Sequence, residues 1–191
     1  MHRRTLLSAA ASAGMAVLTF AACTTNHGPS ATPTEAERAI DEGVDTTMAT
    51  LYSSVPGSKE LAGKARGILV FPKVFDAGLV VGGEHGRGAL RVDGRTAGYY
   101  QTTSLSLGLQ AGAQSKSLVF MFMTQGALDA FVRSSGWTAG ADASVALAKL
   151  GANGVLDAPS GSAEVTAFAL ANEGLMAAAT VDGTKISKLM W

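Results

Sequence analysis

Residues 89–102 read ALRVDGRTAGYYQT, and this stretch points to the fold class of the whole chain. Two runs suited to β-strands, residues 89–92 and 97–102, flank the pair Asp93-Gly94. An Asp-Gly pair between such runs is typical of a two-residue hairpin, because its turn needs positive φ. The sequence therefore predicts an antiparallel hairpin here, with positive φ at Gly94.

Further strand signals lie on both sides of this hairpin. Residues 68–71 form a short apolar run closed by Pro72, which indicates a buried strand. Residues 117–123, SLVFMFM, are apolar on both faces and predict a central strand, and residues 165–170 predict another. Residues 144–150 fit either a helix or a strand.

A second Asp-Gly pair, Asp182-Gly183, lies near the C-terminal end. It separates two further runs suited to strands, residues 175–181 and 184–190. The same reasoning predicts a second hairpin, with positive φ at Gly183.

Helical spacing precedes the strands. Thr34 and Glu37 form a capping box, and Pro56-Gly57 ends the segment. Five apolar residues fall on one face of this expected helix: Ile40, Val44, Met48, Leu51 and Val55. A shorter helix is expected over residues 58–65, with Leu61 and Ala65 inward.

The opposite face of the first expected helix is acidic. It carries Glu35, Glu37, Asp41, Glu42 and Asp45. Anionic lipid repels such a face, so we expect this helix to pack on the core rather than to lie on a membrane. A third short helix is indicated by the spacing of Leu128, Phe131 and Val132, with Gly136 as its stop.

These elements predict an α+β fold. We expect a curved antiparallel sheet, barrel- or sandwich-like, with an N-terminal helical arm and one or two short helices. The folded domain spans residues 34–191, of which 34–66 form the arm and 67–191 the strand-rich body.

The N-terminal segment has the features of an export signal. Residues 1–22 begin with a short basic stretch and continue without a charged residue from Thr5. Phe20-Ala21-Ala22-Cys23 is similar to the lipobox of bacterial lipoproteins, in which the cysteine is acylated. Plain secretory cleavage near Ala21 or Ala22 is the alternative, and export through either the general or the twin-arginine route fits Arg3-Arg4.

Cys23 is the one cysteine of the chain, so an intramolecular disulfide is excluded. Residues 23–33 would serve as anchor and polar tether. The residues after Cys23 are Thr24 and Thr25, and neither is the Asp that retains lipoproteins at the inner membrane in enteric bacteria. The expected place is therefore the periplasmic face of the outer membrane, if the bacterium has one.

Charge and motifs leave little room for catalysis or nucleic-acid binding. Lys and Arg number 15, as do Asp and Glu, whereas nucleic-acid binders usually carry a basic excess. His85 is the one histidine of the predicted body, too few for a metal site of ordinary spacing. Residues 82–88, GGEHGRG, lack the spacing of a nucleotide loop and suit a turn, a bulge or a close backbone approach. No cofactor is predicted, and a hydrolase that uses His85 is the least favoured function.

Several segments, in order from residue 62 to 191, resemble the SYLF domain family. They are GILVFP at 67–72, GLVVGG at 78–83, YY at 99–100, GLQAGAQ at 108–114, FM at 122–123, ALDAF at 127–131, GLM at 174–176 and GTKI at 183–186. The resemblance implies lipid binding, of the phosphoinositide type in eukaryotic members, and no known enzymatic activity. Asp76 stands where a basic residue is common in the family.

Basic residues are concentrated between residues 59 and 95, where they outnumber the acidic ones. Beside Lys59, the candidate lipid-binding residues are Lys64, Arg66, Lys73, Arg87, Arg91 and Arg95. They could orient the domain on anionic phospholipid. Ordinary solvated strand ends are the alternative, and an acyl-chain pocket between the strands is another. The competing function is a lipoprotein that docks a protein partner and contacts lipid only through its anchor.

Overall fold

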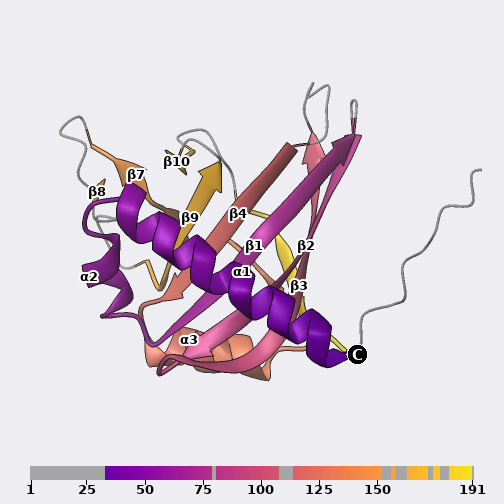
Figure 1. Ribbon diagram of the computed structural model, residues 1–191, viewed down its shortest axis with the longest axis horizontal. Helices are drawn as coiled ribbons and strands as arrows, with labels where there is room; N and C mark the ends of the chain where they lie inside the picture. Colours follow the sequence, from indigo (N-terminus) through magenta and orange to yellow (C-terminus); the bar gives the residue numbers. More distant parts are fainter. Residues whose placement is uncertain are drawn as a thin grey trace, which may run out of the picture. The chain divides into compact units, whose positions relative to one another are not determined.

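An antiparallel sheet that curls into a half-barrel forms the body of the domain, as the computed structural model in Figure 1 shows. The structure describes residues 33–78, 81–107, 114–151, 156–157, 163–171, 174–176 and 181–190. All of them belong to one unit, Ala31–Trp191. The predicted signal, Cys23 and the tether up to residue 32 lie outside the described residues.

The predicted α+β class is confirmed. The main sheet has the order β10-β9-β4-β1-β2-β3-β11-β5, all neighbours being antiparallel, while β6 pairs with β9 in parallel and β7 pairs with β8 separately. The helices are α1 (Pro33–Ser54), α2 (Ser58–Ala62) and α3 (Gln125–Arg133). The strands are β1 (Gly67–Gly78), β2 (Val81–Val92), β3 (Arg95–Leu107), β4 (Gln114–Phe122), β5 (Trp137–Thr138), β6 (Val145–Leu147), β7 (Lys149–Leu150), β8 (Leu156–Asp157), β9 (Val165–Ala171), β10 (Gly174–Leu175) and β11 (Lys185–Lys188).

The first predicted hairpin forms at its predicted turn. Asp93 and Gly94 have φ of 50° and 74°, and Val92 pairs with Arg95 across the turn. The strands are longer than expected, because β2 continues back through the glycine-rich residues 82–88. Of the alternatives for those glycines, a close backbone approach is correct. A Cβ on Gly88 would collide with the Val70 carbonyl oxygen and lie 2.7 Å from the Phe71 ring.

Pro72 does not end the first strand, contrary to the prediction. β1 continues to Gly78, and its register shifts on both sides around Pro72. A bulge accommodates proline, because the residue without an N–H falls where the ladder is already interrupted. The Pro72 carbonyl accepts a hydrogen bond from Ser117 Oγ at 2.7 Å. Its ring lies against Gly43 of α1, where a Cβ would be only 2.9 Å away.

β4 is the central strand that the apolar run 117–123 predicts. Its residues alternate between the two faces of the sheet, and Leu118 to Phe122 are all at most 1% exposed. Leu118, Phe120 and Phe122 belong to one core cluster, and Val119 and Met121 to another.

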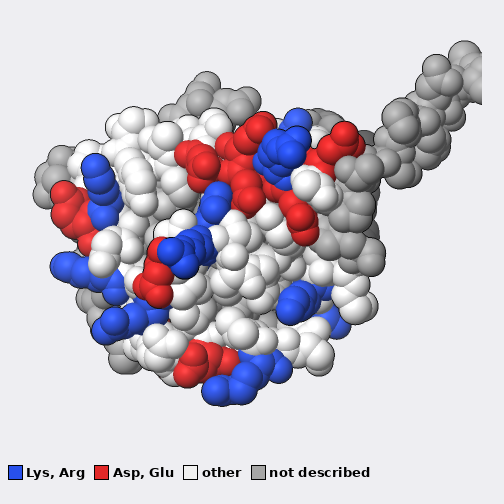
Figure 2. Space-filling model, turned by 60° about the horizontal axis from the view of Figure 1, so that its bottom comes forward, with Lys and Arg blue, Asp and Glu red and all other residues white. Residues whose placement is uncertain are grey.

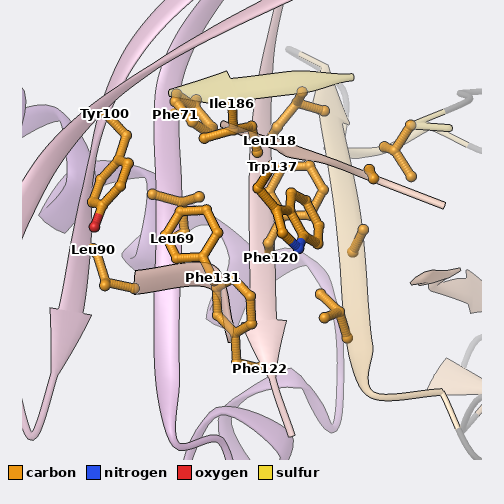
Figure 3. Close-up of a cluster of buried hydrophobic side chains, with 14 of the residues drawn as sticks. Leu69, Phe71, Leu90, Tyr100, Leu118, Phe120, Phe122, Phe131, Trp137 and Ile186 are labelled. Atoms are coloured by element: carbon orange, nitrogen blue, oxygen red, sulfur yellow. The ribbon is translucent and has the colours of Figure 1, made fainter. Parts of the chain in front are cut away.

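The concave face of the sheet is filled with aromatic rings. Trp137 of β5 lies 6.1 Å from Phe120 of β4 between ring centroids, which requires the sheet to curl around this cluster. Phe131 of α3 packs on the same rings, 4.9 Å from Phe122 (Figure 3). This packing favours a filled core over the acyl-chain pocket considered between the strands.

The convex face is covered by α1, which runs obliquely across the strands in Figure 1. Val44, Leu51 and Val55 are buried against it, and Ile40 and Met48 pack at its border, as the helical spacing predicts. The helix begins at Pro33 rather than after a cap at Thr34, since proline suits the first helical position.

The acidic face of α1 is narrower than predicted. Arg91 on β2 forms ion pairs with Asp41 and Asp45, and the side chain of Asp41 is only 31% exposed, whereas that of Asp45 remains 77% exposed. The short helix α3 is capped by Thr124 and ends at Arg133, three residues before Gly136. Val132 is 52% exposed and faces solvent rather than the core.

The second predicted hairpin has the expected turn, but the predicted pairing of its two strands is wrong. A turn does occur at Asp182-Gly183, with φ of 80° at Gly183. However, β11 pairs with β3 and β5, while β10 pairs with β9. A local turn signal fixes the reversal of the chain, but the open edge of β3 decides which strand β11 joins. The ambiguous residues 144–150 contain the strands β6 and β7.

Candidate functional site

A groove of about 530 Å³ opens beside α1, the turn that leads from α2 into β1, and the β2–β3 hairpin. Its volume falls within the range of roughly 300–1,000 Å³ that small-molecule sites occupy. Apolar side chains form one wall: Val44, Met48, Tyr52 and Ile68. Four charged residues also line it: Asp45, Arg66, Arg91 and Asp93.

Arg91 is held by α1 at the edge of this groove. Its Nη2 lies 3.0 Å from Asp45 Oδ1 and 3.3 Å from Asp41 Oδ1, and its Nη1 donates to Thr96 Oγ1 at 2.7 Å. Its side chain is 21% exposed. The positive charge of Arg91 is therefore already balanced within the domain, and its first role is to fasten α1 to the sheet.

Asp41 is the centre of the same network. Its two carboxylate oxygens accept hydrogen bonds from Thr96 Oγ1 and Tyr99 Oη, both at 2.9 Å. Burial, followed by the hydrogen bond to Asp41 and the negative charges of Asp41 and Glu37, raises the pKa of Tyr99 to about 12. Tyr99 therefore remains a neutral donor at every physiological pH.

Arg66 differs from Arg91, although both line the groove. The backbone N–H of Arg66 donates to the Phe122 carbonyl at 2.7 Å, which fixes the turn before β1. Its side chain is exposed and forms no hydrogen bond or ion pair with any residue that the structure describes. Lys64 is exposed in the same turn, and Arg95 is exposed at the start of β3.

The remaining two candidates, Lys73 and Arg87, are cross-strand partners on β1 and β2. Both are exposed, and the alternation of the strands places them on the convex face. Phe75 lies on the same face and is 51% exposed, and its ring has Lys73 Nζ 4.7 Å from the centroid. His85 is exposed opposite Phe75 in the register. We call Lys73, Phe75 and His85 the convex-face patch.

A buried ion pair lies on the concave side of the same strands. Lys116 Nζ is 2.6 Å from Glu84 Oε1, and Ser104 Oγ donates to Glu84 Oε2 at 2.9 Å. The side chains of Lys116 and Glu84 are only 16% and 9% exposed. Since each charge has a partner, this pair is a structural element of the sheet.

The candidate basic residues thus fall into two groups instead of one surface. Arg66 and Arg91 meet at the groove, with Lys64 and Arg95 on neighbouring turns, whereas Lys73 and Arg87 lie farther along β1 and β2. On the face drawn in Figure 2, many of the acidic side chains gather in one area, while Lys and Arg side chains are spread over the face, several of them beside acidic ones. Asp76 lies on β1 opposite Glu84 in the register.

The sequence did not point to the apolar residues of the groove or of the convex-face patch. The alternation of Lys73, Val74 and Phe75 carried a signal for Phe75, because Val74 faces the core. Met48 and Tyr52 belong to the inward helical face, and their partial exposure at the groove depends on where α2 and the hairpin lie. No sequence pattern indicates that arrangement.

Two general features bear on function. Within the ranges that the structure describes, no group of three His, Cys, Asp or Glu side chains is placed to hold a metal ion. None of the described helices is both long and apolar enough to cross a membrane.

The fold and these surfaces define the class of protein: an α+β half-barrel domain with a surface groove beside α1 and an exposed convex-face patch. Comparison with known families then shows that residues 103–189 match the model described as "Ysc84: Las17-binding protein actin regulator". The match confirms the predicted resemblance to the SYLF domain family, whose members are generally binding modules. It runs from within β3 to β11, so the motifs at 67–83 and the pair Tyr99-Tyr100 lie before it. No curated protein matches the chain.

Proposed function

We propose that this chain is a non-catalytic lipid-binding module of the bacterial cell envelope. In this proposal an acylated Cys23 holds the protein at a membrane, with the periplasmic face of an outer membrane as the expected location. The folded domain then contacts anionic phospholipid. The family match supports a binding module, and the lipid specificity and location are the proposed part.

The convex-face patch is the observation that carries this proposal. Phe75 exposes about half of an aromatic ring, and the Lys73 ammonium lies directly over it. Aromatic rings bury favourably at the boundary between headgroups and acyl chains, while each well-placed Lys or Arg adds about 1 kcal/mol on an anionic surface. An exposed ring with a cation beside it combines both contributions at one point.

Vesicle flotation of Cys23→Ser protein tests the domain's own affinity, because this variant lacks the acyl anchor. Phe75→Ser should weaken binding to vesicles containing phosphatidylglycerol about tenfold, and Lys73→Gln about fivefold. Binding should also weaken at 1 M salt, where the Debye length is about 3 Å.

The chain offers matched controls. Val132 on α3 is as exposed as Phe75, and Lys188 on β11 is an exposed lysine away from the patch. Val132→Ser and Lys188→Gln should leave flotation unchanged. Equal loss in the control and test variants, or flotation independent of salt and of Phe75, would contradict the proposal.

The family description favours one second candidate. It names a Las17-binding protein and actin regulator, and such a function depends on protein partners. The exposed acidic residues Glu35 and Glu42 on α1 would suit a basic partner surface. If the Cys23→Ser protein fails to float with any vesicle at any salt concentration, this docking function becomes the better explanation, and the membrane contact is the acyl anchor alone.

A further inference from the structure

The groove beside α1 contains two opposite charges that have no partner among the residues that the structure describes. Arg66 and Asp93 both line it. Neither side chain forms a hydrogen bond or ion pair with any residue that the structure describes, and both residues are exposed. By contrast, the other two charged residues of the groove, Arg91 and Asp45, are paired with each other at 3.0 Å.

An apolar wall lies in the same groove. Met48, Tyr52 and Ile68 are half-buried and leave hydrophobic surface facing the open space, whereas Val44 is buried behind them. Burial raises the pKa of Tyr52, whose hydroxyl therefore stays neutral. Apolar area of this kind gains about 25 cal/mol for every Å² that a ligand removes from water.

We infer that this groove binds a single-chain amphiphile with a zwitterionic phosphate–ammonium headgroup. The alkyl chain lies along Met48, Tyr52 and Ile68, the phosphate contacts the Arg66 guanidinium, and the ammonium contacts the Asp93 carboxylate. This inference goes beyond the membrane contact proposed above, because it uses different residues and a dissolved monomer instead of a bilayer.

The charges select a zwitterion over an anion. A purely anionic head would gain from Arg66 but would approach the Asp93 carboxylate, and like charges at close range are unfavourable. Arg91 cannot compensate, because Asp41 and Asp45 already balance it. A guanidinium is also well suited to phosphate, since its N–H groups match the phosphate oxygens in pairs.

Three amphiphiles with the same twelve-carbon chain test the inference: dodecylphosphocholine, dodecyl phosphate and dodecyltrimethylammonium. Titration calorimetry below their micelle concentrations, on the Cys23→Ser protein, should rank dodecylphosphocholine first. Phosphocholine without a chain should bind far more weakly, since it cannot use the apolar wall. Amide shifts in ¹H–¹⁵N spectra should concentrate at Gly63 and Gly94, which line the groove.

Two conservative variants test the two charges separately, and only the second should change the affinities for the two phosphate-containing ligands in opposite directions. Arg66→Gln should weaken both phosphate-containing ligands about fivefold, the size of one partly exposed charge pair. Asp93→Asn should weaken dodecylphosphocholine and strengthen dodecyl phosphate. Asn tolerates the φ of 50° at this position, so the turn is preserved.

The outcomes separate this inference from the proposed function. Phe75→Ser should leave the affinity for the amphiphiles unchanged. In the Arg66→Gln background, vesicle flotation should still weaken when Phe75 is replaced by Ser. Equal affinity for the three heads, or amide shifts confined to the convex-face patch, would overturn the groove assignment without touching the membrane contact. Ala65→Phe, which narrows the groove while keeping both charges, should abolish binding of all three amphiphiles. Retained affinity in that variant, once folding is confirmed by circular dichroism, would overturn it as well.

Discussion

Lys116 on β4 reaches past β1 to Glu84 on β2, and its ammonium lies 2.6 Å from the Glu84 carboxylate. One ion pair on the concave side of the sheet therefore joins β4 to β2 across the intervening strand β1. The pair lies beyond the aromatic core along β1, near the Val74 and Gly86 positions of the register. Its burial makes it sensitive to the loss of either partner.

Lys116→Met should lower the free energy of unfolding by about 2–3 kcal/mol, because it leaves the Glu84 charge buried without a counter-charge. The double variant Glu84→Gln/Lys116→Met should recover most of this loss, since no charge then remains. Urea unfolding measures both. Lys188→Met, at an exposed lysine, should stay within about 0.5 kcal/mol of the wild type. A double variant less stable than Lys116→Met would show that the pair does not act as described.

Gly88→Ala should severely destabilise the domain, by about 3 kcal/mol or more, because the new methyl group would meet the Val70 carbonyl and the Phe71 ring. Gly83 on the same strand is the matched control. A Cβ there has no neighbour within 4 Å, so Gly83→Ala should change stability by less than about 1 kcal/mol. Thermal unfolding followed by circular dichroism compares the two, and equal melting temperatures would contradict the close approach of β1 and β2.

The free energy of unfolding should decline at alkaline pH, because Tyr99 ionises more readily in the unfolded chain than in the folded domain. A tyrosine in the unfolded chain has a pKa near 10.0, whereas the folded-state pKa of Tyr99 is about 12. Its contribution is therefore complete below pH 10 and is lost as the pH rises toward 12, because the unfolded state releases the proton first.

Tyr99→Phe should make that decline shallower. It should not remove the decline, because burial also raises the pKa of Tyr52 and of Tyr100. Urea unfolding at a series of pH values between 8 and 12 measures the slope. Parallel curves for the variant and the wild type would show that burial and the Asp41 hydrogen bond do not raise the pKa of Tyr99 in the folded state.

The anchor prediction rests on sequence alone. Two or more acyl chains on Cys23 would hold the protein stably, since a single chain gives only marginal binding. Cys23→Ser should then move most of the protein from the membrane pellet to the soluble exported fraction. Mature wild-type protein without added acyl mass in a mass spectrum would refute the lipoprotein assignment.

Local patterns account for the parts of the fold that the sequence predicts. The turn at Asp93-Gly94 needs only two residues of the right kind, and the buried face of α1 and the apolar strand β4 are periodic within a short segment. Pro72 and β11 were misjudged for one shared reason. A bulge in β1 and a free edge on β3 exist only once distant segments have come together.

The candidate site shows the same division. Counting basic residues between 59 and 95 found the arginines, but it could not show that Arg91 would be balanced by Asp41, which is 50 residues earlier in the chain. Nor could it show that Arg66 would share a groove with Asp93. The charge of a segment is a property of the sequence, whereas the pairing of charges depends on the tertiary structure.

The position of β11 also constrains the order of folding during synthesis. Residues 185–188 pair with β3 on one side and β5 on the other, and they are made after every other strand of the sheet that the structure describes. Until they emerge, β3 has an unpaired edge and β5 has no neighbour in the sheet, so the half-barrel cannot complete its curl. Contacts between such distant segments form slowly. A chain that ends before residue 185 would therefore present an open strand edge to other proteins, and truncated products should aggregate or be degraded rather than persist as shorter domains.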